Sequence, residues 1–169
     1  MWYSFELGSN IFDTPIMKIF LSKYIGSIDK KGRISIPSNY RMVLGNCTST
    51  GLIIYPSIKH QCLEACSTQR LEELSQIIET LDPYSEERDA FETTILGESM
   101  HLAFDSEGRV VLPKSLAEYA SIDDKAYFVG KGLVFEIWNP TKFETYLKQA
   151  KDIAKTNRSL LKNIGGKHE

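Results

Sequence analysis

The sequence predicts an α+β fold in which two tandem copies of one unit follow each other along a 169-residue chain, with helices flanking the strands. The strongest observation is an internal repeat: residues 29–37, DKKGRISIP, recur as DSEGRVVLP at residues 105–113. Asp, Gly, Arg and Pro are identical in the two copies, at a constant offset of 76 residues from 29 to 105. A composition of 42% hydrophobic and 25% charged residues is typical of a globular protein with a packed core.

Each copy is expected to contain strands joined by a tight turn, because aliphatic residues flank an Asp-x-x-Gly sequence. Asp at the first position and Gly at the fourth are typical of a type I turn. Pro37 and Pro113 end the pairing, because proline has no N–H group to donate. Residues 52–56 are matched with residues 135–140 of the second copy. The strands are expected at residues 19–28, 34–36, 51–55, 99–104, 110–112, 126–129 and 134–138.

Helices are expected after both repeated motifs and near the end of the chain. Short helices begin at Ser38 and Lys114, and Gly45 follows the first of them at the position of a left-handed cap. Asn139 and Pro140 form a capping residue followed by a first-turn proline, which predicts a helix to about residue 164. One further set has the spacing of a buried helical stripe: Leu74, Ile77, Ile78 and Leu81.

These elements divide the chain into four segments. Residues 1–16 are an N-terminal extension, and the sequence leaves open whether it is native. Residues 17–83 form the first unit with its long helix, and residues 84–146 form a linking helix (85–96) and the second unit. Residues 147–169 form a basic C-terminal helix and tail.

Charge is segregated along the chain, although the net charge is only −2. Residues 17–46 carry six basic side chains against one acidic, whereas residues 47–100 carry three against ten. The tail from residue 147 carries six against two. Because the local field steers a polyanion more than net charge does, we expect a basic face near the first motif.

The first turn is a candidate DNA-reading element: Asp29, Lys30, Lys31, Gly32 and Arg33. Two lysines and an arginine on a tight hairpin suit phosphate contact, and a two-stranded ribbon fits the major groove. Arg33 can bind guanine through two hydrogen bonds while the lysines contact phosphates, and Asp29 orients Arg33 and closes the turn. A turn with an internal Asp–Arg ion pair and no ligand is the simpler interpretation of the motif, and it stays open here.

The second turn has a different chemistry. Ser106 and Glu107 replace the two lysines, so its tip is a poor partner for DNA. Asp105, Gly108 and Arg109 are therefore expected to form a structural second motif.

The two copies together resemble the MraZ family, which consists of two tandem units of the SpoVT-AbrB type. The similarity covers roughly residues 17–146. The residues that carry it are Asp29, Lys31, Gly32, Arg33, Pro37, Tyr40, Arg41, Tyr55 and Pro56 in the first unit, and Asp105, Gly108, Arg109, Pro113, Leu116, Glu118, Tyr119, Ala120, Gly130, Phe135, Glu136, Ile137 and Trp138 in the second. A glycine usual near the amino terminus of the family is replaced, at the nearest position, by Ser22.

The resemblance implies a swapped-hairpin, AbrB-like β-barrel fold in which the two units form a pseudo-dimer. It implies a ring-shaped homo-oligomer that binds promoter DNA at direct repeats upstream of its own division and cell-wall gene cluster. We therefore expect a sequence-specific transcriptional regulator in the cytoplasm, associated with the nucleoid. No membrane and no small-molecule substrate are expected as partners.

Catalytic and metal-binding functions are not expected. Cys62 and Cys66 would lie on one face of a helix, but His60 points elsewhere, and buried structural thiols are the commoner outcome. Cys47 has no neighbouring histidine, and neither a nucleophile elbow nor a phosphate-binding glycine loop occurs. No cofactor, metal or enzymatic activity is predicted.

Two other functions remain open. The chain can be a non-catalytic assembly or scaffold protein, or an antitoxin-type regulator of the AbrB kind. The last helix is basic at Lys148, Lys151, Lys155, Arg158 and Lys162, which favours a solvated face over a DNA contact. The opposite stripe, available for packing on a neighbouring subunit, is formed by Leu147, Ala150, Ala154, Leu161 and Ile164.

Overall fold

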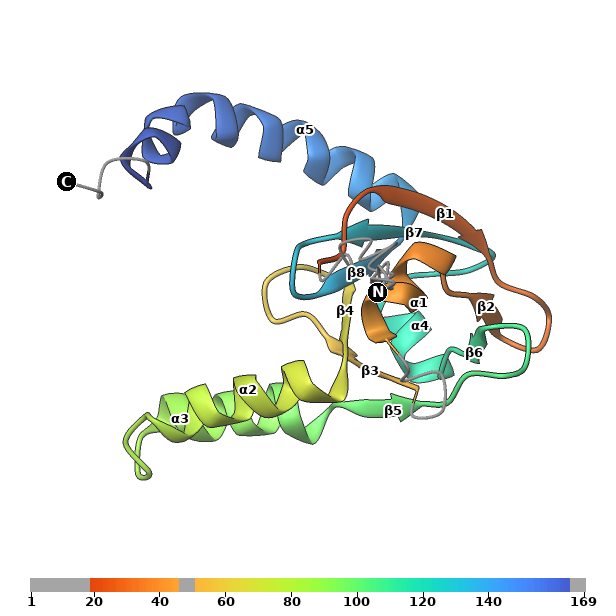
Figure 1. The fold of residues 1–169 in the computed structure, drawn as a ribbon, viewed down its shortest axis with the longest axis horizontal. Helices are drawn as coiled ribbons and strands as arrows, with labels where there is room; N and C mark the ends of the chain where they lie inside the picture. The colour runs from red at the N-terminus through yellow and green to blue at the C-terminus, as the bar shows by residue number, and fades with distance from the viewer. Residues whose placement is uncertain (1–18, 46–50, 165–169) are drawn as a thin grey trace, which may run out of the picture.

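The computed structural model describes residues 19–45 and 51–164 of the chain, and the N-terminal extension at residues 1–16 lies outside them. A β core carries the two repeated motifs, and two helical arms leave it (Figure 1). The fold is mixed α and β with antiparallel strand pairs, as the sequence predicts.

Six strands form one antiparallel sheet in the order β1-β7-β8-β4-β3-β5. Their bounds are Lys23–Ser27 for β1, Leu52–Pro56 for β3, Leu63–Cys66 for β4, Met100–Leu102 for β5, Lys125–Gly130 for β7 and Phe135–Trp138 for β8. A separate ribbon of two strands joins β2 (Arg33–Ser35) to β6 (Arg109–Val111).

The expected closed barrel is not formed by residues 19–45 and 51–164. The sheet ends at β1 on one side and at the three-residue β5 on the other. Pairing between β1 and the ribbon is reduced to one bridge, between Ile28 and Ile34, which is too little to continue the ladder around a barrel. The ribbon packs on the sheet through side chains instead.

The ribbon pairs the two copies of the repeated motif with each other. Its register is centred on Ile34 opposite Val110. On one side of this pair the N–H of Leu112 donates to the carbonyl of Gly32 at 2.8 Å, and on the other the N–H of Ile36 donates to that of Gly108 at 3.2 Å.

The large sheet has a central pair that corresponds to the Ile34–Val110 pair of the ribbon. In it, Glu64 of β4 lies opposite Glu136 of β8. β1 pairs with β7 in the same way that β5 pairs with β3. The strand that corresponds to β8 is therefore β4, and not β3 as the match of residues 52–56 with residues 135–140 implied. No strand was expected at β4, because Leu63–Cys66 has no β-branched or aromatic residue.

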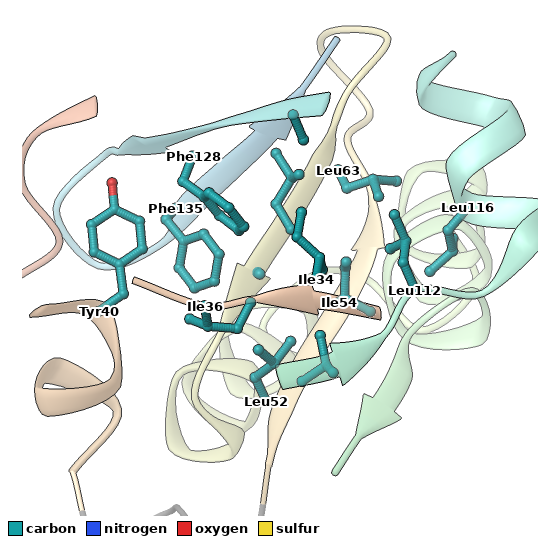
Figure 2. Packing of buried hydrophobic residues seen from close by; sticks show 14 of the residues in the cluster. Ile34, Ile36, Tyr40, Leu52, Ile54, Leu63, Leu112, Leu116, Phe128 and Phe135 are labelled. Carbon is teal, nitrogen blue, oxygen red and sulfur yellow. The ribbon is translucent and has the colours of Figure 1, made fainter. Parts of the chain in front are cut away.

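One apolar cluster fills the space between the ribbon and the sheet. Figure 2 shows Ile34 of the ribbon packed near Leu63, with Phe128, Phe135 and Tyr40 gathered beside them. All of these side chains are at most 1% exposed. Helices α1 (Ser38–Leu44) and α4 (Lys114–Ala120) follow the two motifs and place buried side chains in this cluster.

The first arm is formed by α2 (Thr68–Glu79), α3 (Glu86–Phe91) and a π-helical turn, η2 (Glu92–Gly97) (Figure 1). The expected linking helix thus changes to π geometry after Phe91. The expected buried stripe is only partly present: Ile78 is buried, whereas Ile77 is 56% exposed. In this arm α3 and η2 cover only a narrow face of α2. Leu81 lies beyond the end of α2.

The second arm is α5 (Pro140–Thr156), followed by a 3-10 segment, η3 (Arg158–Ile164). Asn139 caps α5 as predicted, with its side chain accepting a hydrogen bond from the N–H of Lys142 at 3.1 Å. Residues 165–169, which follow the predicted end of this helix, lie outside the described residues. Within the described residues no helix has both the length and the apolar content needed to cross a bilayer.

Candidate nucleic-acid interface

The first Asp-x-x-Gly turn is held together by Asp29. Its Oδ1 accepts hydrogen bonds from the backbone N–H groups of Lys31 at 2.9 Å and Arg33 at 3.0 Å. Its carbonyl oxygen accepts a third from the N–H of Gly32 at 2.9 Å. Gly32 has a φ of 74°, which glycine adopts without a steric penalty. The turn is therefore closed by its own residues, as the motif predicts.

Asp29 also orients the side chain of Arg33. The Nε and Nη2 atoms of Arg33 lie 2.7 Å and 2.6 Å from Oδ2 of Asp29. The side-chain hydrogen bond from Arg33 lowers the pKa of Asp29 to about 2, so the carboxylate stays charged at neutral pH. This pair uses the Nε side of the guanidinium and leaves its Nη1 end for another acceptor.

The second turn has the same backbone hydrogen bonds, but both ends of its arginine side chain are paired with carboxylates. Asp105 accepts from the N–H groups of Glu107 and Arg109 at 2.9 Å and 3.0 Å, and Nε of Arg109 donates to it at 2.8 Å. Here the Nη1 atom of Arg109 lies 2.7 Å from a carboxylate oxygen of Glu107. Glu107 thus occupies the end of the guanidinium that is left over in the first turn.

The two lysines of the first turn remain exposed at its tip. Across residues 19–45 and 51–164, neither Lys30 nor Lys31 forms an ion pair. Their counterparts are Ser106 and Glu107, and the latter neutralises Arg109. The two turns therefore share a shape and differ in charge.

The outer face of the ribbon adds residues that the motif did not identify. Because Ile34 and Val110 point into the core, their neighbours in the strands point outward. Ser35 is exposed and Val111 is 57% exposed, on the same face as Arg33. The alternation of buried and exposed positions was the signal available in the sequence. A hydroxyl and a methyl-bearing side chain on this face can contact base edges.

The alternative metal site is absent from the described residues, where no group of three metal-ligating side chains occurs. Cys66 lies at the end of β4 and Cys62 just before it, and not on a helix as expected. Both thiols are buried, and burial raises the pKa of each, to about 12 for Cys66. The ring centroids of His60 and Tyr146 lie 4.4 Å apart. Cys47 is outside the described residues.

In the part of the chain that the structure describes, the basic last helix packs on the core at its start. Phe143 is 4% exposed and Leu147 packs against the same cluster. Farther along, the expected apolar stripe is in solvent: Ala154 is exposed and Leu161 is 76% exposed. Ile153, which lies outside that stripe, is 63% exposed. The distal half of this arm thus presents both apolar and basic side chains.

Comparison with known proteins gives a consistent result. The family model described as "MraZ protein, putative antitoxin-like" matches residues 95–163, which contain the second repeated motif. The transcriptional regulator MraZ of Rickettsia canadensis (strain McKiel) is 58% identical over 147 residues, covering 87% of this chain and 99% of the relative. Those of Rickettsia akari (strain Hartford) and Rickettsia typhi (strain ATCC VR-144 / Wilmington) are 56% and 55% identical, over 87% and 88% of this chain and 99% of each relative. The chain belongs to the MraZ family.

Proposed function

We propose that this chain is a non-catalytic, sequence-specific DNA-binding transcriptional regulator that reads DNA with its first turn. The observation that carries the proposal is the difference between two turns of one shape. Within the described residues, Asp29 orients Arg33 and leaves its Nη1 end available, and neither neighbouring lysine forms an ion pair. In the second turn, Glu107 pairs with the Nη1 end of Arg109. The printed name of the relatives, transcriptional regulator, supports the same role.

In this proposal the ribbon enters the major groove. Arg33 donates two hydrogen bonds to a guanine while Asp29 holds it in place, and Lys30 and Lys31 contact phosphates. Gly32 allows the backbone to turn tightly at the tip. Asp105, Gly108 and Arg109 keep the second turn folded and do not contact bases.

The two units, residues 17–83 and 84–146, form a pseudo-dimer in this account. Support comes from the registers, because both the Ile34–Val110 pair and the Glu64–Glu136 pair are centres about which the two copies interchange. A single ribbon offers few contacts, so useful affinity needs several subunits on repeated sites. Exposed apolar residues on α5 and η3, among them Ile153 and Leu161, are available for packing against another subunit.

The proposed target is a set of direct repeats upstream of the protein's own division and cell-wall gene cluster, bound by a homo-oligomeric ring. A protein bound to this target would act in the cytoplasm, at the nucleoid. Resemblance to the family is the support for the target and for the ring. An antitoxin-type role would also require a partner protein.

The proposal is tested by fluorescence anisotropy on DNA from upstream of the gene and on scrambled DNA, with wild-type, Arg33→Ala and Arg109→Ala proteins. We expect wild-type protein to prefer the native fragment, Arg33→Ala to lose that preference, and Arg109→Ala to bind normally but unfold at a lower temperature. Equal loss of binding in two folded variants would contradict the division of roles. Absence of DNA binding by the wild-type protein would favour the assembly or scaffold function.

A further inference from the structure

An open hollow of about 490 Å³ lies beside the first turn. Its lining comes from the first turn and, in the other copy of the repeat, from the end of β6 and the start of α4. The lining residues important here are Lys30, Lys31, Gly32, Lys114, Ala117 and Asp123.

The equivalent place at the second turn is filled. Arg41 and Ala117 occupy the same position of α1 and α4, since each N–H donates to the preceding proline carbonyl at 3.0 Å. The guanidinium of Arg41 lies over Gly108, where an added Cβ would be 2.6 Å from its Cζ. Among the described residues, an added Cβ on Gly32 would come no closer than 3.5 Å to the carbonyl oxygen of Leu112 and 4.0 Å to Cγ1 of Val111. Alanine at position 117 therefore leaves the first hollow open.

The hollow is cationic. Lys30, Lys31 and Lys114 line it together with two carboxylates, and one of these, Asp29, is already paired with its arginine. Asp123 is the other carboxylate in the lining. Lys114 is 90% exposed and lies 3.6 Å from Glu118, an exposed pair of a kind that contributes little. Its ammonium group is therefore free to bind a stronger anion.

We propose that this hollow binds one phosphate group of the DNA backbone, with Lys114 as a contact from the second copy of the repeat. This inference rests on the proposed function. Phosphates border the major groove that the ribbon would enter, so a cationic hollow next to the turn tip lies where the backbone passes. Phosphate contacts set the register of a protein on DNA without reading sequence.

The test compares wild-type protein with Lys114→Ala, which removes the charge, and Ala117→Gln, which fills the hollow without adding charge. Lys59→Ala is the matched control, because Lys59 is exposed in the connection between β3 and β4 and is not among the residues that line the hollow. Anisotropy is measured on native and scrambled DNA over a salt series, and thermal unfolding checks that each variant is folded.

For Lys114→Ala we expect the slope of log K against log salt to decrease in magnitude by about 0.9, equal to about eightfold weaker binding at 0.1 M salt. Both DNAs should be affected equally, so the preference for the native fragment is kept. Ala117→Gln should weaken binding in the same direction. If wild-type protein binds DNA and both variants match Lys59→Ala, this inference is wrong and the proposed function stands. If wild-type protein binds no DNA, the proposed function fails first. Tight binding of inorganic phosphate that DNA does not displace would assign the hollow to a free anion and also overturn the inference.

Discussion

Giving the first turn the sequence of the second is the sharpest perturbation of the proposed interface. Lys30→Ser together with Lys31→Glu converts DKKGR into DSEGR, the sequence that already folds into an identical turn at residues 105–109. The backbone bonds to Asp29 use N–H groups and do not depend on the lysine side chains. We therefore expect the double variant to fold and to keep its unfolding temperature within a few degrees of wild type.

The expected loss of binding has two parts. Removing two phosphate contacts lowers the salt slope by about 1.8, equal to about sixtyfold weaker binding at 0.1 M salt. The glutamate introduced at position 31 should also take the Nη1 end of Arg33, as Glu107 takes that of Arg109. Losing a bidentate base contact removes a further 1–3 kcal/mol or so of discrimination, so native and scrambled DNA should become equivalent.

Anisotropy over a salt series, with subunit assembly checked by analytical ultracentrifugation, measures both parts. The control is Lys59→Glu with Lys148→Ser, which makes the same change in charge in the connection between β3 and β4 and in α5. The reasoning would be refuted by a folded double variant that keeps the wild-type preference for the native fragment. It would also be refuted if the control lost binding to the same extent.

Three further predictions concern the residues that support the turn and the core. Ser22 has a φ of 73°, so Ser22→Gly should raise the free energy of unfolding by about 0.5 kcal/mol in urea titrations, and a lower value would show that its side chain is needed. The carboxyl carbon of Asp29 should titrate near pH 2 by NMR, because the folded pKa of this group lies below its unfolded value. The contribution of Asp29 to the stability of the folded protein is therefore complete above about pH 4 and is lost as the pH falls through about 2. Replacing its arginine partner with alanine should move that midpoint toward 3.8, and no movement would argue against the ion pair. With Cys47 changed to serine, Cys62 and Cys66 should resist Ellman's reagent at pH 8, because both thiols are buried and burial raises their pKa. Both should react in urea, and rapid labelling of the native protein would contradict their buried placement.

The repeated turns were predictable because their geometry is local. Asp29 and Asp105 each bond to N–H groups two and four residues ahead, and the glycines at positive φ complete the turn. The capping of α5 by Asn139 is equally local. Ser22, the position nearest to the family's usual glycine, adopts the positive φ that a glycine would favour.

Elements that depend on tertiary packing were harder to predict. β4 contains Glu64 between small and buried residues, a pattern with low strand propensity. It is stable as a strand because β3 and β8 pair with it, and because Tyr55 and Ser57 donate hydrogen bonds to the Glu64 carboxylate at 3.0 Å and 2.7 Å. No short-range pattern contains those partners.

The candidate site was only partly predictable for the same reason. The motif identified Arg33 and its lysines, but not that Glu107 closes the corresponding arginine in the second turn. The contrast between Arg41 and Ala117 becomes meaningful only when the hollow and Gly108 are seen beside them. A repeat in sequence shows which positions correspond, and the structure shows which differences change the surface.

The most direct test of the central claim is a structure of the protein bound to the DNA upstream of its own gene. The account predicts that the first turn lies in the major groove, with Nη1 of Arg33 within about 3 Å of a guanine acceptor. Arg109 should remain paired with Glu107 and away from the bases. A complex in which the second turn or α5 occupies the groove, with Arg33 in solvent, would contradict the account.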